Sequence, residues 1–219
     1  MRFDVDAVIF DMDGTLLDSM RYWRYTSLEY MLHHRWPVTN EDLARMHDTS
    51  ARKLVPEIAA RLGKDIGGME TLVKELAGYM HRHYLYDVSL KDEYVLPFVR
   101  RLAREGKRMC VATGAPREYA RDGLKRLGVL PMLEFVTDVY EYGFGKDREE
   151  YFDIVAKRLG TVPERCLVVE DALYAIEIAK KRGCTVLAIE DDTARNQREE
   201  IRRLADAYIQ SFAEVAEEG

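Results

Sequence analysis

The stretch VIFDMDGTLLDS, residues 8–19, leads a short apolar run into two aspartates, Asp11 and Asp13. Alternate side chains of an extended chain point the same way, so we expect Asp11 and Asp13 to face one spot, with Met12 turned aside. Gly14 would permit the sharp bend that must follow. One of these carboxylates could attack an electrophile while the other moves protons. An Asp-x-Asp pair by itself is also typical of a helix cap and turn.

Polar residues also follow other apolar runs of the chain. They are Thr113 and Gly114 of ATGAP, Lys146 of GFGKD, and Glu170 and Asp171 of VVEDA. Ligands of open parallel sheets bind at the carboxyl ends of the strands, so these groups are expected to gather around Asp11 and Asp13. Carboxylates this close repel one another unless a positive charge lies among them. A set of oxygen ligands suits Mg²⁺, which also takes up substrate phosphate.

This constellation indicates phosphoryl transfer. We expect Asp11 to attack phosphorus and form an aspartyl-phosphate. Mg²⁺ and Lys146 would screen the approach of one anion to another. Thr113 and nearby backbone N–H groups, such as that of Gly114, would hold the remaining phosphoryl oxygens. Asp13 would protonate the leaving oxygen and later take a proton from water.

The elements that must position these residues follow an alternating pattern. Short apolar runs occur at Ala7–Phe10, Met109–Ala112, Phe135–Val136, Cys166–Val169 and Val186–Ile189. Amphipathic helical patterns lie between several of them, and many end in a cation followed by a glycine, as at 61–63 and 181–183. Alternating strands and helices predict an α/β fold with a mostly parallel sheet covered on both faces.

A helical block interrupts this alternation. It comprises patterns at Tyr22–His33, Asn40–Met46, Ser50–Leu62 and Met69–Tyr84. Thr39 with Asp42 predicts a capping box, and Pro56 is expected to divide or kink the third pattern. We therefore predict a helical domain at 19–90 and a catalytic core at 1–18 and 91–219. The hinges would lie near Leu17–Ser19 and Ser89–Glu93.

Composition limits the class of protein. The 219 residues carry 33 basic and 39 acidic side chains, for a net charge of −6, which argues against a nucleic-acid partner. No apolar run approaches the roughly 20 residues needed to span a bilayer, and no signal segment is evident. The three cysteines, an odd number without metal-site spacing, are typical of reduced core thiols. We expect a cytoplasmic protein that does not bind membranes and is a monomer or a weak dimer.

The segments DMDGTLLDS, TGAP, GKD and VVEDALYAI resemble the four motifs of the haloacid dehalogenase superfamily, in order and spacing. The similarity is greatest to the subfamily with an α-helical cap inserted after the first motif, which includes β-phosphoglucomutase and phosphoglycolate phosphatase. The resemblance implies a Rossmann-like, doubly wound core with a cap domain.

The resemblance also implies roles for individual residues. Asp11 would be the nucleophile, Asp13 the general acid and base, and Thr113 and Lys146 the groups that hold the phosphoryl group. Mg²⁺ would be bound by Asp11, the backbone carbonyl of Asp13 and the pair Glu170 and Asp171. Glu170 and Asp171 could instead serve only as partners of a helix N-terminus.

The chain departs from the family pattern at several positions. Family members often have a K-P-x-P stretch at the motif-three lysine, whereas this chain reads KDREEY from residue 146. Phe144 also stands where an arginine is common, so the family pattern does not predict the conformation of this loop. β-Phosphoglucomutase has a hinge histidine where this chain has Trp23, and its G-x-S-R cap motif here reads DTSARK, with Arg52 displaced by one. These differences argue against mutase activity. Trp23 and Arg52 could meet substrate, or be a core aromatic and a solvated helix residue.

The sequence therefore predicts a Mg²⁺-dependent phosphatase of a small phosphorylated metabolite. One alternative is a β-phosphoglucomutase-like phosphomutase, which would share all four motifs. A second alternative, of a different class, is a non-catalytic module that binds a phosphorylated metabolite. Cap closure over the site would exclude water and select the leaving group.

Overall fold

The computed structural model describes residues 1–46 and 49–216, and these residues form two compact units. Unit 1 comprises Met1–Asp18 and Ser89–Gly219, and unit 2 comprises Ser19–Val88. Each unit has its own core and is described separately. No helix of the described residues combines the length and apolar character needed to cross a bilayer.

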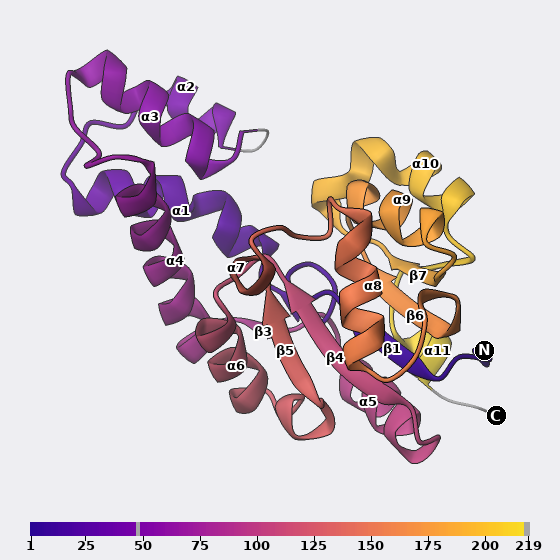
Figure 1. Cartoon of the computed structure of the whole chain (residues 1–219). Helices are drawn as coiled ribbons and strands as arrows, with labels where there is room; N and C mark the ends of the chain where they lie inside the picture. The colour runs from indigo at the N-terminus through magenta and orange to yellow at the C-terminus, as the bar shows by residue number, and fades with distance from the viewer. Residues whose placement is uncertain (47–48, 217–219) are drawn as a thin grey trace. The chain divides into compact units, whose positions relative to one another are not determined.

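Unit 1 is built on a six-stranded sheet with the order β5-β4-β1-β6-β7-β8, in which every neighbouring pair is parallel (Figure 1). The strands are β1 (Ala7–Phe10), β4 (Arg108–Thr113), β5 (Phe135–Asp138), β6 (Cys166–Glu170), β7 (Thr185–Ile189) and β8 (Ala207–Ile209). The predicted parallel α/β sheet is confirmed. β5 extends two residues beyond the apolar pair that predicted it, and the short β8 was not predicted.

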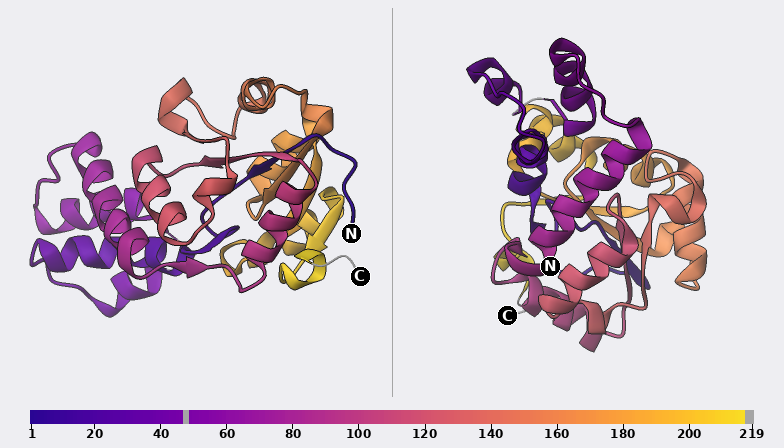
Figure 2. Two further views of the ribbon diagram at one scale, coloured as in Figure 1. Left: turned by 90° about the horizontal axis from the view of Figure 1, so that it is seen from below. Right: turned by 90° about the vertical axis from the view of Figure 1, so that its left-hand side faces the viewer.

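Helices cover both faces of this sheet. They are α5 (Val95–Arg104), α6 (Arg117–Arg126), α7 (Val139–Tyr142), α8 (Glu149–Arg158), α9 (Leu173–Lys181), α10 (Arg198–Leu204) and α11 (Ala213–Ala216). Ile9 of β1 belongs to a core that includes residues of α8 and α9, whereas the next residue, Phe10, packs edge-on against Phe98 of α5. Phe98 in turn contacts Phe212, and α5 and α11 lie side by side (Figures 1 and 2).

A second, two-stranded sheet joins the two stretches of unit 1 that lead to unit 2. β2 (Leu17–Asp18) pairs antiparallel with β3 (Ser89–Leu90). The backbone N–H of Lys91 also donates to the carbonyl of Leu16 at 2.9 Å. Ser89 and Leu90, which the sequence placed in the helical domain, therefore belong to unit 1. Such short strands carry too little apolar pattern to be recognised without their partner.

Unit 2 consists of α1 (Met20–His33), α2 (Asn40–Arg45), α3 (Ala51–Leu62) and α4 (Met69–Tyr86). α1 packs against both α3 and α4 around a core that contains Tyr30, Leu54 and Leu76. The capping box predicted for α2 is confirmed, since Thr39 and Asp42 exchange side-chain and backbone hydrogen bonds.

The sequence predicted that Pro56 divides or kinks this helix. A division is wrong, because α3 runs unbroken through Pro56, and a kink stays a prediction. Pro56 lies in the second turn of α3, where it cannot donate the usual backbone hydrogen bond and its ring crowds the carbonyl four residues earlier. Buried neighbours on the same helix, Leu54, Val55 and Ile58, hold that turn against the core.

Candidate active site

Asp11 leaves the end of β1, at the centre of the sheet. Its N–H still donates to the carbonyl of Val169 on β6 at 2.9 Å, so the residue stays fixed to the neighbouring strand. The chain then turns: the N–H of Gly14 donates to Leu17 and that of Leu17 to Met12, each at 2.9 Å. Gly14 has φ of 90°, which supports the predicted bend, and the side chain of Met12 is fully buried.

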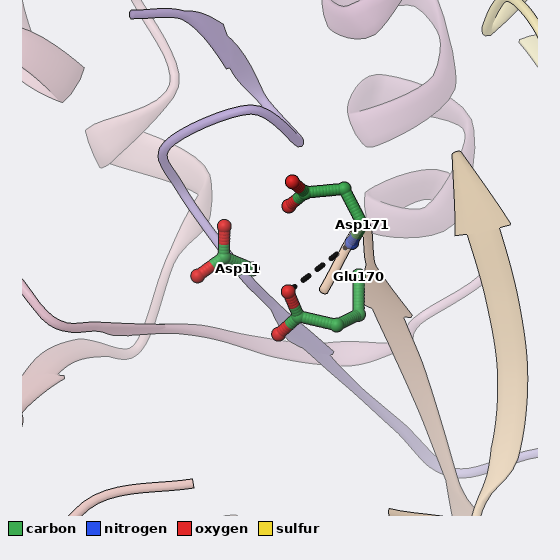
Figure 3. A group of neighbouring side chains, drawn as sticks. All are labelled: Asp11, Glu170 and Asp171. Carbon is green, nitrogen blue, oxygen red and sulfur yellow. Dashed lines mark hydrogen bonds between the residues drawn. The ribbon is translucent and has the colours of Figure 1, made fainter. Parts of the chain in front are cut away.

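Glu170 and Asp171 come from the end of β6, which pairs directly with β1. The Glu170 carboxylate accepts hydrogen bonds from the N–H groups of Asp171 and Ala172, both at 3.1 Å, and this fixes its orientation. The Asp171 carboxylate accepts a bond of 2.8 Å from the buried hydroxyl of Thr15. The side chains of Asp11, Glu170 and Asp171 lie beside one another in Figure 3.

Lys146 reaches the same place from the loop between α7 and α8. Its ammonium group donates to the carboxylate of Asp11 and, at 2.6 Å, to that of Glu170. The preceding Gly145 is required here, because a Cβ at this residue would lie 2.6 Å from a methyl group of Val139. Asp147, which stands where the family pattern has proline, accepts a 3.3 Å hydrogen bond from the N–H of Gly145 and so supports the loop.

Burial and mutual repulsion dominate the electrostatics of these carboxylates. Burial and the charge of Glu170 raise the pKa of Asp11 to about 7, although Lys146 opposes the shift and Asp13 adds to it. Burial and the charges of Glu170, Asp11 and Asp191 raise the pKa of Asp171 well above its ordinary value. Burial alone would lower the pKa of Lys146, but Asp11 and Glu170 raise it well above its ordinary range, so the ammonium stays charged.

The carboxylates fit a divalent cation. One oxygen from each of Asp11, Glu170 and Asp171 lies within 4.8 Å of the others, and all three side chains are buried. Lys146 supplies one positive charge to three potential negative charges, and the remaining repulsion adds to burial in raising the pKa values of Asp11 and Asp171. An all-oxygen donor set with uncompensated negative charge is typical of Mg²⁺ sites.

The remaining predicted residues fall into two groups. Thr113 ends β4, next to β1, and its buried hydroxyl accepts a 3.0 Å hydrogen bond from the N–H of Ala115, while Gly114 between them is exposed. Their contact with a phosphoryl group stays a prediction. Trp23 and Arg52 belong to α1 and α3 of unit 2 and are described within that unit alone.

The sequence of the chain matches the model of the haloacid dehalogenase-like hydrolases over residues 5–183. The chain therefore belongs to the haloacid dehalogenase-like hydrolase family, as the four motifs suggested, and it is an enzyme of the hydrolase class.

Individual relatives span nearly the same length. The chain is 24% identical to the validoxylamine A 7'-phosphate phosphatase of Streptomyces hygroscopicus subsp. limoneus, over 95% of both proteins. It is 29% identical to the phosphorylated carbohydrates phosphatase of Thermotoga maritima, over 82% of both. The structure of CbbY from Rhodobacter sphaeroides in complex with phosphate superimposes with a TM-score of 0.79 over 96% of each chain, at 18% identity. This last similarity shows a shared fold.

Two residues beside the site were not singled out from the sequence. Thr15 lies inside the first motif, and a threonine followed directly by two leucines could have indicated a buried hydroxyl that needs a partner. Tyr174, on the first turn of α9, interacts electrostatically with the charged cluster. No sequence pattern distinguishes it from other exposed tyrosines.

Proposed function

We propose that this protein is a Mg²⁺-dependent phosphatase that hydrolyses a small phosphorylated metabolite through a phosphoryl group carried on Asp11. The observation that carries the proposal is the contact between the Asp11 carboxylate and the Lys146 ammonium inside a buried cluster of carboxylates. Two similar proteins are named as phosphatases, of validoxylamine A 7'-phosphate and of phosphorylated carbohydrates, which supports the same reaction here.

The first half of the reaction transfers the phosphoryl group to the protein. A carboxylate oxygen of Asp11 attacks phosphorus, and the bond between phosphorus and the ester oxygen breaks. Asp13 donates a proton to that oxygen, so an alcohol leaves. Asp13 is suited to this because it is partly exposed, two residues beyond the nucleophile, and its charge acts on that of Asp11.

The second half regenerates the free enzyme. Asp13, now ionised, takes a proton from water while the water oxygen bonds to phosphorus. The bond between phosphorus and Asp11 breaks, which releases inorganic phosphate and restores the carboxylate. Lys146 stays bonded to Asp11 and Glu170 throughout and offsets negative charge as the anions meet. Thr113 and the backbone N–H of Gly114 hold the other phosphoryl oxygens.

Asp11, Glu170, Asp171 and the backbone carbonyl of Asp13 would hold Mg²⁺. When bound, the ion supplies positive charge that neutralises the phosphoryl oxygens and lowers the repulsion between two anions. Removing protons from the carboxylates with raised pKa values is part of loading such a site, so we expect metal affinity to rise with pH.

Unit 2 would act as the cap predicted from the sequence. A helical insertion that closes over the carboxyl edge of the sheet would exclude water and restrict the substrate to small molecules. Trp23 and Arg52 are its candidate substrate contacts, the first as an aromatic surface and the second as a cation for an anionic substrate.

The direct test is hydrolysis of p-nitrophenyl phosphate with Mg²⁺ and with EDTA. We expect turnover that needs the metal, and a covalent phosphoryl group visible by mass spectrometry after an acid quench. Asp11→Asn should abolish both, because an amide cannot attack phosphorus. Turnover that persists in Asp11→Asn would contradict the covalent route.

The same preparation separates the alternatives. A phosphomutase would isomerise a hexose 1-phosphate with little free phosphate released, and would need a bisphosphate activator. A non-catalytic binding module would bind phosphorylated metabolites without turnover of any of them. Release of phosphate from several small esters, without isomerisation, would support the phosphatase.

A further inference from the structure

Asp138 is a buried acidic residue that takes no part in the proposed reaction steps. It ends β5, opposite Thr113 at the end of β4, and it is 7% exposed. One carboxylate oxygen, Oδ1, accepts hydrogen bonds of 3.1 and 2.9 Å from the N–H groups of Tyr140 and Glu141, and so caps α7. The other oxygen, Oδ2, accepts a bond of 2.7 Å from the N–H of Arg117 on α6. A helix cap needs only the first of these oxygens.

The bond to Arg117 supplies a partner that α6 lacks at its own N-terminus. Arg117 is the first residue of α6, and the preceding Pro116 has no side-chain group that could accept a hydrogen bond. The first N–H groups of a helix have no partner within that helix, so the partner must come from elsewhere. Asp138 provides it from the strand next to β4. One carboxylate therefore fixes the start of α6 to the end of β5.

The segment 113–117 connects β4 to α6 and includes two predicted phosphoryl contacts, the hydroxyl of Thr113 and the N–H of Gly114. Its first residue is fixed because β4 pairs with β1 and β5. Its last residue, Arg117, is fixed through the bond to Asp138. Gly114 has no side chain that could hold its peptide plane, so the direction of its N–H depends on both ends of the segment.

We propose that Asp138 is a positioning residue that directs the Gly114 N–H and the Thr113 hydroxyl toward the phosphoryl group. It acts through the backbone of α6 and not by contact with the substrate. The candidate metal ligands come from β1 and β6, and the hydrogen bonds that hold them do not involve Asp138. Loss of the bond to Arg117 should therefore weaken phosphate binding and leave Mg²⁺ binding unchanged. The proposal rests on the phosphatase activity proposed above.

The chain allows this one hydrogen bond to be removed from either side. Arg117→Pro removes the N–H donor, and proline is favoured at the first position of a helix, so α6 should stay intact. Arg117→Ala is the matched control, because it keeps the N–H and loses the same side chain, which pairs with Glu141 at 3.3 Å. Asp138→Ser retains an oxygen that caps α7 but has no second oxygen for Arg117.

The test measures two dissociation constants by calorimetry, that of inorganic phosphate with Mg²⁺ present and that of Mg²⁺ without phosphate. We expect Arg117→Pro and Asp138→Ser each to raise the dissociation constant of phosphate by about tenfold, because a misdirected donor no longer meets its oxygen. Arg117→Ala should change it by less than about twofold, and every variant should bind Mg²⁺ within about twofold of wild type. The double variant should bind phosphate as well as either single variant, since both changes remove the same bond. Thermal unfolding verifies that each variant is folded.

Other results overturn the proposal. Unchanged phosphate binding in Arg117→Pro would mean that the bond does not position the segment, and failure of this variant to fold would mean that the bond serves the fold alone. An equal change in Arg117→Ala would assign the effect to the arginine side chain. A parallel loss of Mg²⁺ affinity would show a general disturbance of the site. Wild-type protein that binds phosphate but does not hydrolyse p-nitrophenyl phosphate would refute the proposed function instead, and the separate assay distinguishes that failure.

Discussion

Replacing Lys146 with methionine tests the electrostatic account of the site. The side chain is buried, and its ammonium contacts the carboxylates of Asp11 and Glu170. Methionine fills similar space without the charge, so Lys146→Met leaves both carboxylates without their cation. Removing one partner of a buried ion pair costs about 3–5 kcal/mol, because the charge left behind is not solvated.

The size of this effect depends on pH, and the sign follows from Asp11. Its pKa is raised from 3.8 to about 7 in the folded protein, chiefly by burial. The unfolded chain therefore loses its proton first as pH rises, and the folded protein loses stability between about pH 4 and pH 7. Lys146 limits the shift, so without it the pKa of Asp11 rises further. The loss of stability then continues above pH 7, by about 1.4 kcal/mol for each added unit of pKa.

The assay is urea unfolding in EDTA at pH 6, 7 and 8.5, for wild type, Lys146→Met and the control Lys125→Met. Lys125 is an exposed residue of α6, so its replacement should change stability by less than about 0.5 kcal/mol at every pH. We expect the deficit of Lys146→Met to be larger at pH 8.5 than at pH 6. Phosphatase activity of Lys146→Met, measured separately with Mg²⁺, should be lost at all three pH values.

A deficit that is the same at pH 6 and pH 8.5 would refute this reasoning, because ionisation of Asp11 would then not depend on the lysine. If Lys146→Met were as stable as Lys125→Met at pH 8.5, the electrostatic account would be refuted more strongly. The buried carboxylates would in that case need no neighbouring cation.

Four further outcomes are expected. Thr15→Val should destabilise the protein by about 1–3 kcal/mol and weaken Mg²⁺ binding measured by calorimetry, since Asp171 loses its hydrogen bond. Mg²⁺ at about 100 times its dissociation constant should raise Tm by roughly 5–10 °C, and EDTA or Asp171→Asn should remove that rise. Although burial alone would raise the pKa of Asp42, hydrogen bonds from Arg61 and Thr39 lower it to about 2. Asp42→Asn should therefore cost about 2 kcal/mol at pH 7 in chemical unfolding, with the difference from wild type shrinking as pH falls from about 4 toward 2. Burial raises the pKa of all three cysteine thiols, those of Cys110, Cys166 and Cys184. Ellman's reagent should therefore react with these thiols only after the protein unfolds.

The gathering of the acidic residues was predictable because it follows from strand order. Asp11 and Glu170 each come at the end of an apolar run, and parallel neighbouring strands bring such ends to one edge. The bond between Lys146 and Asp11 was less certain from sequence, since the loop lacks the proline pattern of the family. The path of this loop requires a residue without a Cβ at Gly145. The sequence shows the glycine but not the neighbouring side chain that makes it necessary.

Features that depend on contacts between distant segments were not predictable. The bond from Thr15 to Asp171 joins residues 156 positions apart, and nothing local requires it. The pairing of Leu17 with Leu90 forms strands too short to leave a periodic pattern. The division expected at Pro56 does not occur, because helix propensity takes no account of the apolar contacts that stabilise α3.

Asp18 and Ser89 are cross-strand partners, and between them the chain makes its whole excursion through residues 19–88. Because the two ends of the insertion are paired, its length does not change the distance that the chain must span within unit 1. Evolution could therefore lengthen, shorten or exchange the helical segment without shifting the strands that hold the aspartates. Substrate recognition could therefore change through unit 2 while the reaction catalysed by unit 1 stayed the same.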